Sequence, residues 1–120
     1  MSLEPTLRIH IANATTPIPV YMNRAPDGIT GTFIVQRLIG KQDSQLGTSY
    51  ARIQHDIFGP TYADVKNAAV AVEAAYRTFT GAGTFAVYRG NEIETYESSL
   101  NLHRVILDAV LRFEERPQFG

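Results

Sequence analysis

Hydrophobic positions follow the spacing of β-strands in four segments of the chain. Residues 32–40 are dense in Phe, Ile, Val and Leu, as in an interior strand, and residues 49–59 alternate between apolar and polar side chains. Two further strands are predicted at residues 85–96 and 100–113, which a tight turn connects. One face of the second segment consists of Ala51, Ile53, His55 and Ile57.

One segment carries the three-and-four spacing of an amphipathic helix. It follows the Gly59-Pro60 breaker, and Thr61 and Asp64 resemble a capping box with Asp in place of Glu. The glycine-rich residues 80–83 end this helix. Its predicted apolar stripe consists of Tyr62, Val65, Ala69, Val72, Tyr76 and Phe79.

The N-terminal residues allow two interpretations. Leu3, Leu7 and Ile11 lie at helical spacing, whereas Leu7, Ile9 and Ile11 also alternate as in a strand. We favour a short helix over residues 3–14. Residues 17–22 are extended, and their two prolines confine them to a sheet edge because proline lacks a backbone donor.

These elements predict a single α+β domain over residues 1–120. We expect a mostly antiparallel four-stranded sheet, with one long helix packed on a face and a short N-terminal helix. Two hairpins, joined by a right-handed helical crossover between the second and third strands, give the strand order 1-2-4-3.

Composition excludes several classes of function. The chain has 11 Lys and Arg against 12 Asp and Glu, so it has no positive excess from which to build a nucleic-acid-binding face. It has no cysteine, which excludes disulfides, thiol nucleophiles and Cys-ligated zinc. Its apolar runs are far shorter than the roughly 20 residues of a membrane helix. Its first residues lack the features of a signal peptide. We therefore expect no membrane partner.

Candidate catalytic and metal-binding side chains are isolated from one another. His10, His55 and His103 have no second ligand at the spacing of a helical metal site. His55 and Asp56 are neighbours on a strand and so point to opposite faces. We interpret the histidines as ordinary half-buried side chains and expect no catalytic residue, no cofactor and no metal ion.

One charged pattern occurs twice. Arg52 and Asp56 in the second strand, and Arg104 and Asp108 in the fourth, share the spacing Arg-x-x-x-Asp, which places each pair on one strand face. A solvated face with unrelated charges is one interpretation. The other is a paired stripe that fixes strand register or contacts a neighbouring subunit, with Arg52 opposite Asp108 and Asp56 opposite Arg104.

Several motifs together resemble the tail completion, or tail terminator, proteins of long-tailed phages. Gln36-Arg37 closes an apolar strand, and Gly40 and Asp43 follow it. The next motif is an Ala-Arg-Ile-Gln-x-Asp strand with a Thr-Tyr-x-Asp helix start, within residues 50–65. A third comprises Tyr96-Glu97 and residues 102–108. The likeness spans about residues 33–113, in the family's order, whereas the first thirty residues depart from it.

The resemblance implies a structural virion protein without an active site. Such proteins close the head-proximal end of a tail tube as a six-membered ring, end tube polymerisation and contact the neck, while DNA passes through the lumen without specific binding. The partners would be further copies of the chain, the tail tube protein and the neck proteins. Residues 17–30 and 42–48 are polar and turn-rich, so we expect them to be the chief assembly surfaces.

Other functions remain open on the sequence alone. Another neck protein, such as a head-completion connector, differs from the favoured interpretation only by family likeness. A small enzyme would need His55 or His103 in a concave pocket with a polarised partner. A cytoplasmic binding module has no positive signal beyond the small size of the chain.

Overall fold

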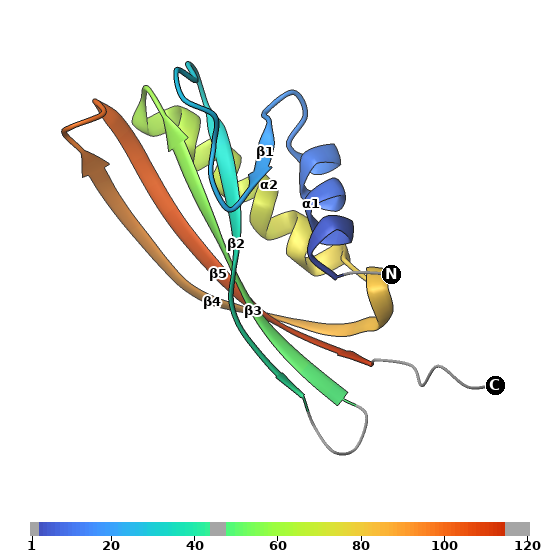
Figure 1. Ribbon diagram of the computed structural model, residues 1–120. Coiled ribbons are helices and arrows are strands. Elements are labelled where there is room, and N and C mark those ends of the chain that lie inside the picture. The colour runs from blue at the N-terminus through green and yellow to red at the C-terminus, as the bar shows by residue number, and fades with distance from the viewer. Residues whose placement is uncertain (1–2, 44–47, 115–120) are drawn as a thin grey trace.

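The computed structural model describes residues 3–43 and 48–114, which form two α-helices, a short 3-10 helix and five strands (Figure 1). In chain order the elements are α1 (Leu3–Ala14), β1 (Val20–Met22), β2 (Phe33–Asp43), β3 (Thr48–Gly59), α2 (Tyr62–Thr78), η1 (Gly81–Gly83), β4 (Thr84–Glu97) and β5 (Leu102–Glu114).

The strands form one mixed sheet in the order β1-β2-β3-β5-β4. The predicted four-stranded antiparallel sheet is therefore wrong, because β1 adds a fifth strand that runs parallel to β2. This strand is only three residues long, too short for alternation to be visible in the sequence. The long strands β2, β3, β5 and β4 lie side by side in that order, and β3 and β5 are antiparallel neighbours, as predicted.

Both α-helices cover the same face of the sheet, whereas the prediction placed only the long helix on a face and left the short N-terminal helix unplaced (Figure 1). The helix over residues 3–14 is confirmed, and it buries Leu3, Leu7 and Ile11 in the main core. Helix α2 starts at its predicted cap, where the Thr61 side chain accepts a hydrogen bond from the backbone N–H of Asp64 (3.1 Å). Strands β3 and β5 complete the core with their inward residues, among them Ile53, Ile57, Val105 and Leu107.

The opposite face of the sheet is largely uncovered. Phe33, Val35 and Phe58 form a small buried cluster there, against which Tyr21 and Ile29 pack. The molecule is elongated, 51 × 23 × 23 Å, with a radius of gyration of 15.0 Å. A compact chain of this length has a radius of gyration of about 14 Å. The long strands therefore present an extended and accessible surface.

Candidate functional site

The four residues of the repeated Arg-x-x-x-Asp pattern meet on the uncovered face, across β3 and β5. Arg52 Nη2 lies 2.6 Å from Asp108 Oδ2, and Arg104 Nη2 lies 2.7 Å from Asp56 Oδ2. We call these four residues the charged stripe. The structure thus joins all four residues that the sequence singled out into two ion pairs.

The predicted direct opposition of these residues is wrong by two positions. Asp108 faces Gln54 and Asp56 faces Ile106 in the ladder. The two members of each ion pair are therefore diagonal neighbours on the sheet face. The long arginine side chains can reach across this diagonal. Spacing within each strand assigned the face correctly but did not determine the register.

The ion pair at Asp56 is the more buried of the two. The Asp56 side chain is fully buried, and it also accepts a hydrogen bond from Gln54 Nε2 (2.6 Å). Its partner Arg104 donates to Glu97 Oε1 (2.8 Å) and lies over the Phe58 ring. Burial alone lowers the pKa of Arg104, but the hydrogen bonds to Glu97 and Asp56 raise it overall. This end of the stripe is a fixed, charged cluster.

The ion pair at Asp108 connects three strands. Arg52 on β3 is 53% exposed, yet it donates to Asp108 through both Nε and Nη2. The other carboxylate oxygen of Asp108 accepts from the backbone N–H of Asn91 (2.7 Å), where the β4–β5 register shifts. A Cβ at Gly90 would collide with Asp108, so this close approach requires glycine.

A neutral polar network occupies the helix-covered face. We call His55, Gln36 and Tyr76 the buried triad: His55 Nδ1 lies 2.6 Å from the Tyr76 hydroxyl, and His55 Nε2 lies 2.9 Å from Gln36 Oε1. The Gln36 oxygen only accepts, so we infer that Nε2 carries the proton and Nδ1 accepts from the tyrosine. His55 is fully buried, which corrects the expectation of a half-buried side chain.

Burial sets the protonation states of this triad. It lowers the pKa of His55 to about 3, and together with the charges of Asp108 and Glu73 it raises the pKa of Tyr76. Both groups are therefore neutral at physiological pH. A histidine closed off from solvent cannot exchange a proton with a substrate, so the triad serves the packing of β2, β3 and α2.

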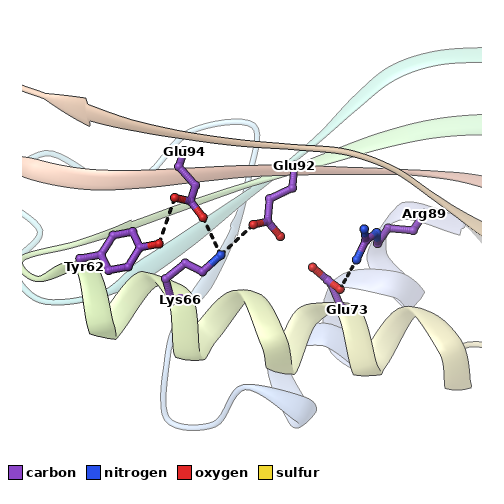
Figure 2. Close-up of polar contacts among 6 residues, drawn as sticks. All are labelled: Tyr62, Lys66, Glu73, Arg89, Glu92 and Glu94. Carbon is purple, nitrogen blue, oxygen red and sulfur yellow. Dashed lines mark hydrogen bonds and ion pairs between the residues drawn. The ribbon is translucent and has the colours of Figure 1, made fainter.

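A third polar cluster, which the sequence analysis missed, connects α2 to β4 (Figure 2). Lys66 Nζ donates to Glu92 (2.8 Å) and Glu94 (2.6 Å), and the Tyr62 hydroxyl donates to Glu94 (3.0 Å). The hydrogen bonds to Glu92 and Glu94 raise the pKa of Lys66. Two turns further along α2, Glu73 accepts a hydrogen bond from Arg89 (2.6 Å). The only signal in the sequence is that Glu92 and Glu94 share a strand face.

The remaining histidines have structural partners. His10 Nε2 lies 2.9 Å from the Ala75 carbonyl oxygen, and His103 packs edge-on against the rings of Tyr62 and Tyr96. Within residues 3–43 and 48–114, no group of three or more His, Cys, Asp and Glu side chains is placed to hold a metal ion. In the same part of the chain, no helix has the length and apolarity needed to cross a membrane.

The two segments expected to make assembly contacts differ in what the structure describes. Residues 17–30 include β1 and contribute Tyr21 and Ile29 to the cluster on the uncovered face. In the segment 42–48, residues 44–47 lie outside the described residues.

Comparison with known proteins gives a likeness of fold. No family model and no curated protein matches the chain. A chain in the virion of a native gene transfer agent particle superposes with a TM-score of 0.69 and 15% sequence identity. The match covers 95% of this chain and 96% of that one, so the two share the whole fold.

Proposed function

We propose that the chain is a structural protein of a phage-like virion that forms a six-membered ring at the head-proximal end of the tail tube. There it ends tube polymerisation and joins tail to head, and DNA passes through its lumen. The observation that carries the proposal is the nearly complete match in fold to a chain of a virion particle. The motifs that resemble tail terminators, within about residues 33–113, support it separately.

The electrostatics of the charged stripe suit a passage for DNA. Each arginine of the charged stripe has a carboxylate within 2.7 Å, so neither offers an unbalanced positive charge. Several free cations would bind phosphates tightly and slow the passage of DNA, because each neutralised phosphate adds to affinity. The partners in this proposal are further copies of the chain, the tube protein and the neck proteins.

Deleting the coding sequence from the genome that carries it tests the proposal. We expect tail tubes of uncontrolled, excessive length and heads without tails, both measured by electron microscopy, with normal particles restored by the wild-type chain. Tubes of normal length that fail to attach to heads would overturn the terminator role and favour a head-completion connector. Normal particles without the chain would overturn the proposal altogether.

A further inference from the structure

The sheet has two open edges. Strand β1 pairs only with Ile34–Gln36 of β2, so residues 37–43 of β2 have no outer neighbour among the described strands. At the other end of the sheet, the 14-residue strand β4 pairs only with β5 in the described part of the chain. Open edges present unpaired backbone donors and acceptors that another strand can occupy.

Both edges also expose large apolar side chains. Leu38 and Ile39 are 39% and 51% exposed on the free part of β2, and Ile93 and Tyr96 are 53% and 49% exposed on β4. A long edge with exposed apolar residues promotes association unless it is paired. Both edges therefore have the exposed apolar side chains and unpaired backbone groups that favour pairing with another strand.

The charges on the two edges differ in sign. Residues 37–43 of β2 include Arg37 and Lys41 against one carboxylate, Asp43 at the end of the strand. Strand β4 carries three glutamates against one arginine, and two of these glutamates share the single ammonium group of Lys66. Pairing β2 with β2, or β4 with β4, would oppose like charges, whereas pairing β2 with β4 opposes unlike ones. The β2 edge of one copy is thus complementary in charge to the β4 edge of a second copy.

Strand direction and face agree with this pairing. Since β2–β3, β3–β5 and β5–β4 are all antiparallel, β2 and β4 run in opposite directions, and copies related by rotation would pair them antiparallel. Lys41 faces Ala51 on the helix-covered side, the side on which Glu92 and Glu94 reach Lys66. On the uncovered side, Arg37 of β2 lies 3.9 Å from Asp56, and Glu97 of β4 binds Arg104. Arg37 and Glu97 therefore lie on the same side of the sheet.

We infer that copies of this chain join edge to edge, with residues 37–42 of β2 in one copy paired antiparallel with β4 of the next. A head-to-tail contact of this kind uses two different surfaces and closes into a ring when the rotation between copies permits. The result is a sheet continuous around the ring, with both helices on one side of its wall and the charged stripe on the other. This inference rests on the proposed function and specifies which surfaces build the ring.

Disulfide trapping tests the contact, and no native thiol can form a competing disulfide because the chain has no cysteine. Leu38→Cys is combined in turn with Glu92→Cys, Glu94→Cys and Tyr96→Cys, all on the helix-covered side, so that the three pairs sample the register. After mild oxidation we expect at least one pair to give a ladder of linked dimers, trimers and larger species on a denaturing gel. Each single-cysteine variant should remain mostly unlinked.

Charge reversal sharpens the same experiment. In the pair that links best, Lys41→Glu should reduce the yield of ladder about tenfold, which corresponds to about 1.4 kcal/mol, and Lys41→Arg should retain it. Absence of a ladder in all three pairs would overturn the inference, as would single-cysteine variants that dimerise as efficiently as the pairs. The proposed function fails by a different result, normal particles or tubes of normal length without the chain.

Discussion

The two faces of the sheet both bury polar groups, but in opposite charge states. Neighbouring residues of β3 supply both: His55 points into the helix-covered core and is neutral, whereas Asp56 points to the uncovered face and pairs with Arg104. Under the helices, burial lowers the pKa of His55 to about 3. On the uncovered face, Arg104 keeps its charge because carboxylates surround it.

This difference indicates what each face contributes. An ion enclosed between a sheet and two helices would carry a large desolvation penalty. The covered core therefore contains a neutral network, in which His55 makes hydrogen bonds to both Gln36 and Tyr76. The ion pairs of the uncovered face are partly accessible to solvent, with Arg52 53% and Arg104 22% exposed. The covered face therefore stabilises the fold, whereas the uncovered face and the sheet edges remain accessible.

The largest expected effect comes from breaking the buried triad. His55→Ala removes the ring and leaves the Tyr76 hydroxyl and the Gln36 oxygen without their partner. We expect the free energy of unfolding, measured by urea denaturation, to fall by about 3–5 kcal/mol. His10→Ala, which removes a histidine at a partly buried site, should cost about 1 kcal/mol. Equal losses in the two variants would contradict the role assigned to the triad.

Acid should weaken the fold through the same histidine. The pKa of His55 is about 3 in the folded chain and 6.5 in the unfolded one, so the unfolded state binds the extra proton between these values. Stability is therefore complete above about pH 6.5 and is lost as the pH falls, by about 1.4 kcal/mol per unit between pH 6 and pH 4. Urea titrations of wild type and His55→Gln isolate this contribution, because the variant should lose that part of the slope. An unchanged slope in His55→Gln would rule out His55 as its source.

Removing the buried charge of the stripe should have an intermediate effect. Asp56→Asn takes the carboxylate from Arg104 but leaves Glu97, and Arg104 is 22% exposed. We expect a loss of about 2 kcal/mol, less than the 3–5 kcal/mol typical of a fully buried pair. Thermal or urea unfolding measures it, and a neutral result would show that Asp56 does not hold β3 against β5.

The exposed end of the stripe should contribute least to stability. Arg52 is 53% exposed, so Arg52→Ala should cost only about 0.2–1 kcal/mol, and high salt should reduce the difference further. A double-mutant cycle with Asp108→Asn measures the coupling between the two side chains. A coupling above about 2 kcal/mol would mean that this pair behaves like the buried one and that the contrast within the stripe is wrong.

The elements with strong periodicity were predictable from the sequence, and the ones that depend on distant contacts were not. Helix α2, its Thr61 cap and the pairing of β3 with β5 follow from local pattern and short connections. The sequence placed residues 17–22 at a sheet edge but did not count them as a strand of the sheet or predict that β1 runs parallel to β2. Three residues carry no period, and packing rather than a hairpin sets the partner strand.

The charged stripe and the buried triad were likewise predictable only in part. The face shared by Arg52 and Asp56 follows from strand geometry, but the register does not, because an arginine reaches a diagonal partner as well as a direct one. The buried triad left a signal that was not used: Gln36 and Tyr76 each interrupt an apolar face, as His55 does. Three polar interruptions on facing elements indicate a network, because a buried polar group needs a partner.

The central claim is that this chain forms the ring between tail tube and head. A cryo-electron microscopy reconstruction of the intact particle tests it most directly. We predict one ring of six copies at the head-proximal end of the tube, with DNA or an open channel at its centre. Density for the chain along the tube, within the capsid or nowhere in the particle would contradict the claim.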